Sequence, residues 1–255
     1  MKMKLTNDTY FDPKNQKKYM SVSQLKSFMD CEARALAEIN GEWKPEKTDA
    51  LLVGSFVDSY FEGKLPEFKF ANQSMFNMNG SLKAPFRHAE RIIERIECDE
   101  LFMEMLSGQK QIIQTGEIDG IPFKIKMDSY HPGNMIVDLK IMRDFEPVYV
   151  KEKGRLSFIE AWGYDIQGAV YQYIEGNHLP FLIAAATKEK EPDIGIWQIE
   201  QSELDACMEI IRPKIQRYAL LKIGIGEPER CEKCDFCKRT KKLTRIMSSE
   251  EMNYE

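Results

Sequence analysis

The segment from Glu117 to Lys140 constrains the fold more than any other part of the chain. Apolar and polar residues alternate from Ile121 to Tyr130, which predicts a strand with one buried face. The next four residues, His-Pro-Gly-Asn, are typical of a turn, and the apolar run after them predicts a second, more buried strand. We therefore expect this segment to fold as a β-hairpin.

Two aspartates and a lysine occupy the predicted hairpin. Asp128 lies on the first strand, and Asp138 and Lys140 lie on the second, two residues apart and therefore on one face. Two carboxylates suit a hard divalent cation such as Mg²⁺, and an ammonium group can orient a water molecule or offset charge on a phosphate. The alternative is an exposed hairpin with scattered charges, because Asp-x-Lys is a common tripeptide.

Composition and charge limit the class of protein. The 255-residue chain is 43% hydrophobic and 11% aromatic, which is typical of a folded protein rather than a disordered one. The net charge of −5 argues against a general nucleic-acid-coating protein, but it allows a local basic groove around an acidic metal site. The sequence has no apolar run long enough to span a bilayer, and its amino terminus does not resemble a signal peptide, so we expect a cytoplasmic protein without membrane contact.

One domain is the expectation for this length. It would have a helical part over about 19–106, a core over about 107–225, and a Cys-rich basic tail over about 229–255. Sequence periodicity predicts helices over about 21–39, 49–61, 86–106, 158–176 and 203–223, and strands over about 111–118, 121–130, 135–140, 182–188 and 194–199. Residues 1–19 and 62–85 are expected to be irregular.

Two of the predicted helices carry further candidate site residues. Gly54 lies in the middle of the 49–61 helix, where a glycine usually marks the close approach of another backbone. Asp58 follows four residues later, and a charged residue on a buried helix requires a partner, which is either a metal or a basic side chain. Gln167 and Tyr171 are also four residues apart, so they share one face of the 158–176 helix.

The six cysteines are distributed unevenly. Three of them follow one another at a regular spacing: Cys231, Cys234 and Cys237. This run suits a zinc ion or an iron–sulfur cluster, and Cys31, which lies off the apolar stripe of its helix, is the candidate for the fourth ligand. The alternative is a set of free thiols in a reducing compartment. Cys98 and Cys207 lie within helical patterns and are expected to be small core residues.

Basic residues gather in two places. One row lies on the polar face of the 86–106 helix: Arg87, His88, Arg91 and Arg95. A solvated surface is favoured there over contact with DNA. Residues 238–245 carry five basic residues and no acidic one, which suits either phosphate contact or a solvated tail.

The order of these motifs along the chain resembles that of the PD-(D/E)xK nuclease superfamily. The motifs are Gly54-x-x-x-Asp58, Asp128, Asp138-Leu139-Lys140 and Gln167-x-x-x-Tyr171. More narrowly, residues 19–242 are similar to the phage exonucleases of the RecE (exonuclease VIII) and lambda exonuclease type, within the RecB-like nuclease group. The resemblance implies an α/β (α+β) fold with a restriction-endonuclease-like core, in which a mixed sheet of about five strands is flanked by helices.

The resemblance also implies a metal site. Asp128, Asp138 and the backbone carbonyl of Leu139 would hold Mg²⁺, with Mn²⁺ as a substitute. Asp58 stands where relatives carry His or Glu, so its shorter side chain would reach the cation less directly, with a water molecule as a bridge.

Other matching residues would act on the substrate. Lys140 would orient the attacking water, and Gln167 and Tyr171 would support the lysine and the scissile phosphate. Glu117 lies near an acidic position of some relatives and is a weaker candidate. Three basic residues are guesses for contact with DNA or a 5′ phosphate: Lys26, Arg34 and Arg87.

The activity implied by the resemblance is processive 5′→3′ degradation of duplex DNA ends, which leaves 3′ single-stranded tails for recombination. A phage or prophage origin, a ring-shaped homo-oligomer (trimer or tetramer) and a RecT- or Redβ-like single-strand annealing partner belong to the same expectation.

Two alternatives stay open. The cysteines are similar to those of iron–sulfur nucleases of the CRISPR-associated and AddB type, which would hold a [4Fe–4S] cluster, and a catalytically silent DNA-end-binding protein would hold structural zinc.

Overall fold

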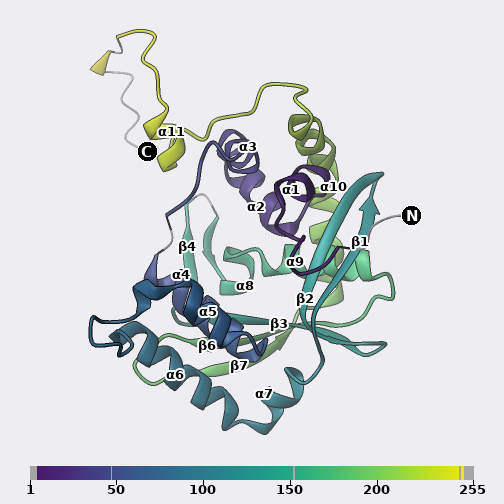
Figure 1. Ribbon diagram of the computed structural model, residues 1–255. Coiled ribbons are helices and arrows are strands. Elements are labelled where there is room, and N and C mark those ends of the chain that lie inside the picture. The colour runs from purple at the N-terminus through teal and green to yellow at the C-terminus, as the bar shows by residue number, and fades with distance from the viewer. Residues whose placement is uncertain (1–4, 47, 152, 247, 250–255) are drawn as a thin grey trace.

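The computed structural model describes residues 5–46, 48–151, 153–246 and 248–249. A five-stranded sheet lies between two groups of helices (Figure 1). The helices are α1 (Pro13–Lys18), α2 (Val22–Asp30), α3 (Glu32–Asn40), α4 (Asp49–Phe61), α5 (Leu65–Ala71), the 3₁₀ turn η1 (Gln73–Met75), α6 (Ala84–Glu97), α7 (Glu100–Met105), α8 (Phe158–Ala161), α9 (Tyr164–Glu175), α10 (Gln201–Lys222) and α11 (Asp235–Arg239). No helix among these residues is both long and apolar enough to cross a membrane.

The sheet is mixed. Its strands are β1 (Gln109–Ile118), β2 (Ile121–His131), β3 (Met135–Met142), β6 (Phe181–Thr187) and β7 (Ile194–Gln198), in the spatial order β1-β2-β3-β6-β7. Only the β3–β6 pair of this sheet is parallel, and the segment that connects the two strands contains α8, α9 and a separate small hairpin of β4 (Val148–Val150) and β5 (Gly154–Leu156). The predicted mixed α/β fold with five central strands and flanking helices is confirmed.

Alternation along β3 divides the interior into two cores. Ile136 and Met142 pack with residues of α2, α9 and α10, whereas Val137 and Leu139 pack with residues of α4, α6 and α7 on the opposite face. The even-numbered residues of β3 therefore face α9. A Cβ placed on Gly54 of α4 would stand 4.0 Å from the Cβ of Ile141, which is an ordinary contact distance. Helix α4 therefore packs on β3, but the predicted close approach of a backbone at Gly54 is wrong.

The hairpin of β2 and β3 opens toward one end. The two strands pair only from Ser129–Val137 to His131–Met135, and a Gly133 with φ of 72° makes the turn. Beyond this short ladder, β2 stays paired with β1 and β3 stays paired with β6. The two strands therefore separate at Asp128 and Asp138, which leaves polar backbone groups and both carboxylates at the mouth of a gap.

Three helices that the periodicity predicts as continuous are broken. Cys31 adopts an extended conformation (φ −165°, ψ 108°) between α2 and α3. Asp99 caps the start of α7 with its side chain, which separates α7 from α6. Gly163, with φ of 62°, separates α8 from α9. The apolar periodicity continues across each break, because the helices on either side pack into the same core, and it therefore concealed the breaks.

Short elements also replace some of the irregular stretches. Residues 1–19 contain α1, and residues 62–85 contain α5 and η1, although both stretches were expected to lack structure. Cys98 is exposed and not a core residue, because it follows the last turn of α6, whereas Cys207 is buried as predicted.

Candidate active site

Asp138 and Lys140 project from β3 into the gap between β2 and β3. The Asp138 side chain is only 2% exposed, and its Oδ2 forms an ion pair with the Nζ of Lys140. Its other oxygen accepts a 2.7 Å hydrogen bond from Nε2 of Gln167, which reaches it from α9. Burial lowers the pKa of Lys140, but the carboxylates of Asp138 and Asp128 raise it more, so the lysine stays protonated.

Asp128 faces the same gap from β2. Its Oδ2 accepts a 3.2 Å hydrogen bond from the backbone N–H of Leu139. The N–H and C=O of one strand residue point to the same side, so the carbonyl of Leu139 also faces the gap. Burial, followed by the nearby Asp138 carboxylate, raises the pKa of Asp128 to about 7.

Asp58 approaches from α4, on the other face of the sheet. It lines a cleft of about 460 Å³ together with Asp128, Asp138, Leu139 and Lys140. Burial, and then the Asp128 carboxylate, raises its pKa well above the usual value. The ligand oxygens of the three aspartates do not all lie within 4.8 Å of one another, whereas Asp138 lies against Asp128. Asp58 is therefore the more distant member of the set.

The donor set fits a hard divalent cation. Burial, and then the charge of neighbouring carboxylates, raises the pKa of both Asp58 and Asp128, and a cation among these groups would remove the penalty of their charges. Carboxylate and carbonyl oxygens are the ligands that Mg²⁺ accepts, and it commonly retains several water molecules. Asp128, Asp138 and the Leu139 carbonyl would hold the cation, and Asp58 would reach it through one of those waters.

Two other predicted residues lie beside this centre. Tyr171 is buried and lines the cleft, and its hydroxyl donates a 2.9 Å hydrogen bond to the carbonyl of Lys126 on β2. Lys26 extends from α2, and its Nζ donates to the carbonyl of Trp162 at 2.8 Å. Burial, and then the charge of Lys140, lowers the pKa of Lys26 to about 8. A second ammonium group is thus close enough to Lys140 for the charge of Lys140 to act on it.

Three weaker candidates do not line the cleft. Glu117 is exposed on β1, opposite Pro122. It lies six positions beyond Gln111, so about 20 Å of strand separate the two residues. The structure thus places Glu117 outside the candidate site, because β1 carries this residue away from the end of the strand that holds Gln111. Arg34 forms ion pairs with acidic residues of α2 and α3, and Arg87 donates a hydrogen bond to the carbonyl of Leu82.

Gln111 is a site residue that the motifs do not reveal. The β1–β2 register pairs residue 110 with 129 and residue 112 with 127, so Gln111 stands opposite Asp128. Its Nε2 donates a 3.0 Å hydrogen bond to Oδ1 of Asp128, and among the described residues its buried Oε1 has no hydrogen-bond partner. Its backbone has φ of 53°, a strained conformation for a residue other than glycine. The hairpin register was the one sequence signal that could have identified it.

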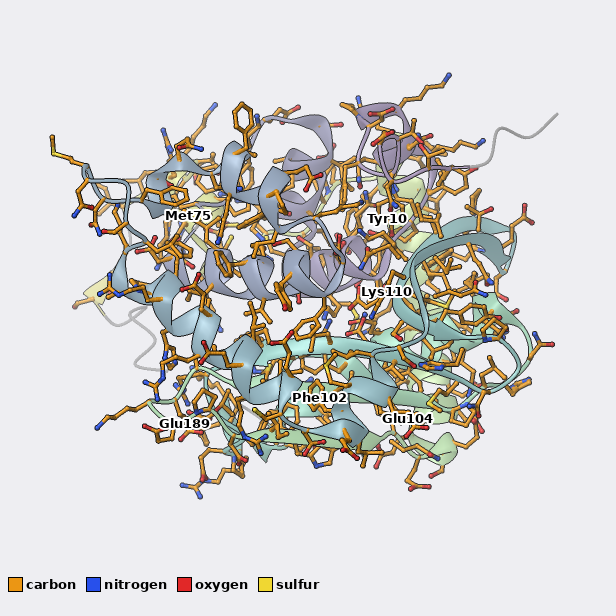
Figure 2. The ribbon with its side chains drawn as sticks, turned by 60° about the horizontal axis from the view of Figure 1, so that its bottom comes forward. Tyr10, Met75, Phe102, Glu104, Lys110 and Glu189 are labelled. Atoms are coloured by element: carbon orange, nitrogen blue, oxygen red, sulfur yellow. The ribbon has the colours of Figure 1, made fainter. Side chains whose placement is uncertain are left out.

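A small cavity of about 10 Å³ adjoins Gln111, Asp58, Asp128 and Leu139. This volume is close to the smallest that admits one water molecule, and most of the exposed lining is apolar, with polar groups of Asp58, Gln111 and Asp128 at its border. Figure 2 labels Lys110, which borders this cavity from β1, and Tyr10, which borders the larger cleft from the amino-terminal segment.

The four predicted cysteines meet at a second site, near α3. Cys31 and Cys237 are buried, and Cys231 and Cys234 are partly buried. Their sulfur atoms all lie within 4.8 Å of one another. The predicted convergence of Cys31 with the carboxyl-terminal run is therefore present in the structure.

Comparison with known proteins agrees with this arrangement. A family model described as a PDDEXK-like domain of unknown function (DUF3799) matches residues 21–240. The chain belongs to this family. The matched range includes the whole carboxylate site of the PDDEXK-like domain and all four clustered cysteines. The predicted membership of the PD-(D/E)xK superfamily is confirmed.

A solved structure shares this PDDEXK-like fold over its full length. It is the crystal structure of a protein from Eubacterium rectale named "Putative exonuclease", with 47% sequence identity and a TM-score of 0.94. The similarity covers 99% of each chain. No protein with a curated description matches the chain.

Proposed function

We propose that this protein is a divalent-metal-dependent exonuclease that degrades duplex DNA from its ends. The observation that carries the proposal is the meeting of Asp128, Asp138 and Lys140 where β2 and β3 separate. The PDDEXK-like family and the name of the relative from Eubacterium rectale support it.

The side chains have separable roles in hydrolysis of a phosphodiester. Mg²⁺, or Mn²⁺ in its place, would supply activation of a water molecule and neutralisation of charge on the phosphate. Lys140, protonated and fixed by Asp138, would orient the attacking water and donate to a phosphate oxygen. Gln167 holds Asp138 in the orientation that a cation needs.

Two further groups complete the proposed site. Tyr171 ties α9 to β2 through the carbonyl of Lys126, which fixes the wall of the cleft behind the scissile phosphate. Lys26 adds a second positive charge near Lys140. Together with Lys126, which lines the cleft, the two lysines would attract a phosphate to this carboxylate-rich site, so the net charge of −5 does not prevent local binding of DNA.

The finer activity follows the resemblance to RecE and lambda exonuclease. We propose processive 5′→3′ degradation that leaves 3′ single-stranded tails, a ring-shaped trimer or tetramer around the duplex, and transfer of the tail to a RecT- or Redβ-like annealing protein of the same phage or prophage. A ring would retain DNA topologically and would thereby allow processivity without a strongly basic surface. The DNA and protein partners of this protein and its location in the cytoplasm are part of this proposal.

The test compares DNA substrates and variants of the full-length chain. Linear duplex DNA labelled at either its 5′ or its 3′ ends, and a covalently closed circle, are incubated with Mg²⁺ or with a chelator. We expect Mg²⁺-dependent loss of the 5′-ended strand of linear DNA only, abolished by Asp138→Ala and unchanged by the control Glu117→Ala. Cutting of the circle would contradict an end-directed activity, and binding of DNA ends without cutting would favour the silent end-binding protein that the shorter Asp58 side chain allows.

A further inference from the structure

The spacing of the four cysteine sulfurs distinguishes between the two kinds of metal centre that thiolates form. The Sγ of Cys31 lies 3.6 Å from that of Cys237, which in turn lies 4.0 Å from that of Cys231. All four sulfurs, including that of Cys234, lie within 4.8 Å of one another. These distances describe one compact group of four sulfur atoms, with separations that a tetrahedron around a single ion allows.

A single tetrahedral ion requires this spacing. Four sulfurs at the Zn–S distance of about 2.3 Å, separated by tetrahedral angles, stand about 3.8 Å apart. In a [4Fe–4S] cluster each thiolate binds a different iron at its own corner of a cube, so the four sulfurs necessarily lie farther from one another. A [2Fe–2S] centre would likewise distribute two pairs of sulfurs over two irons. The iron–sulfur cluster implied by the resemblance to iron–sulfur nucleases therefore does not fit this set of residues.

The surroundings of the sulfurs suit thiolates. The Sγ of Cys231 accepts a hydrogen bond from the backbone N–H of Cys234 at 3.3 Å, and the Sγ of Cys234 accepts one from the N–H of Cys237 at 3.4 Å. The guanidinium groups of Arg34 and Arg230 interact with the charges of the cysteines. Four thiolates and one divalent ion have a net charge of −2, which these N–H groups and two arginines offset.

We propose that Cys31, Cys231, Cys234 and Cys237 bind one zinc ion, which fastens the carboxyl-terminal segment to the break between α2 and α3. Zinc is preferred to a single iron because four-thiolate tetrahedral sites bind Zn²⁺ more tightly than Fe²⁺. The ion has no redox role in this proposal. It joins two parts of the chain that are 206 residues apart in sequence.

The contacts around the cysteines show what the zinc would hold in place. After α10 the chain passes over α3 to reach α11 (Figure 1). The backbone N–H of Glu229 donates to the carboxylate of Glu32 at 2.8 Å, and Arg217 of α10 binds the same carboxylate through two hydrogen bonds. The ring of Phe236 contacts Trp43 edge-on at 5.6 Å. The segment thus wraps α3: the contacts of Glu32 hold its start, and the zinc would hold its end.

This closure bears on the catalytic cleft through α2 and α3. A groove of about 490 Å³ runs along these helices and shares Tyr10, Phe11 and Ser23 with the carboxylate cleft. The extended conformation of Cys31 sets how α2 and α3 meet, so a ligand bond at this residue would fix the groove wall. The zinc is therefore a structural element, and its presence does not depend on whether the carboxylate site cuts DNA.

The test measures metal content directly. The full-length protein is produced with excess iron, purified without oxygen and without added zinc, and analysed for zinc, iron and acid-labile sulfide. We expect one zinc per chain, no iron or sulfide and no visible absorption. One iron or four irons per chain would overturn the proposal, and so would a metal-free protein.

Variants and a thiol titration complete the test. Cys237→Ser should lose the zinc, whereas the matched control Cys98→Ser, at an exposed cysteine outside the cluster, should keep it. Asp138→Asn should also keep one zinc per chain, which separates this proposal from the proposed nuclease activity. If Cys237→Ser does not fold, the wild-type thiols are titrated with a mercurial reagent, and one zinc should be released as four thiols react. Reaction of those thiols without zinc release would contradict the assignment.

Discussion

Replacing Asp128 by asparagine should make the cation-free protein more stable while removing its activity. The carboxylate of Asp128 is held out of water next to Asp138, which raises its pKa from 3.8 to about 7. The carboxyl group of Asp128 therefore ionises near its ordinary pKa of 3.8 in the unfolded chain, but only near pH 7 in the folded protein. Above pH 7 the buried charge lowers the free energy of unfolding. The difference in pKa, at about 1.4 kcal/mol per unit, corresponds to roughly 4 kcal/mol of lost stability.

The neighbours of Asp128 can accommodate the amide. The new carbonyl oxygen would keep the hydrogen bond from the N–H of Leu139, and the new NH₂ group would face Gln111. Rotation of the Gln111 side-chain amide would present Oε1, which has no partner among the described residues, to that NH₂ group. The rotation exchanges an unpartnered Oε1 for an unpartnered Nε2, so the substitution removes a charge without increasing the number of buried groups that lack a partner.

The assay is urea unfolding in Mg²⁺-free buffer, followed by tryptophan fluorescence between pH 5 and pH 9. An acid with a raised pKa in the folded state weakens folding as the pH rises from about 4 to about 7, and the penalty is complete above that. The difference between Asp128→Asn and wild type should therefore increase across this window and reach a few kcal/mol at pH 8. The control Glu117→Gln removes an exposed carboxylate and should show no such difference. A constant difference at all pH values would refute the explanation.

Four other perturbations test the remaining parts of the site. Lys140→Ala should lower kcat by roughly 10²–10³-fold in a nuclease assay, because it removes a donor aimed at the developing charge, and Gln167→Ala should lower it by roughly 10–100-fold through misorientation of Asp138. Gln111→Leu should weaken Mn²⁺ binding by roughly 10–100-fold in calorimetry without DNA, whereas unchanged affinity would show that Gln111 serves only the fold. Mn²⁺ affinity of the wild type should fall by about tenfold for each pH unit below 7, because the cation must displace the proton of Asp128; a flat profile from pH 5 to pH 8 would contradict that competition.

The hairpin and its motif were predictable from sequence because they depend on local rules. Alternation set the faces of β2 and β3, and the Pro-Gly turn set their register, which places Asp128 beside Asp138. Asp58, a charged residue on an apolar helix, indicated a helix that packs beside a polar site, and Gln167 follows from the helical spacing of α9. Each of these inferences requires only contacts that one element makes with its immediate neighbour.

Other features depend on tertiary contacts that leave little trace in local sequence. The break at Cys31 is held by contacts with residues near 229–237, so no local pattern indicates it. Gln111 takes a strained backbone conformation because the strand must aim its amide at Asp128. The greater distance of Asp58 from the other carboxylates arises from the packing of α4 on the opposite face of the sheet.

Anomalous diffraction from crystals soaked in Mn²⁺ would show whether the gap between β2 and β3 binds a cation. We expect one strong peak between the carboxylates of Asp128 and Asp138 and the backbone carbonyl of Leu139. We also expect that an Asp138→Asn crystal soaked in the same way lacks this peak. Saturating Mn²⁺ that leaves the gap between β2 and β3 without a peak, or that binds only elsewhere on the protein, would contradict the claim that these side chains form a metal-dependent catalytic centre.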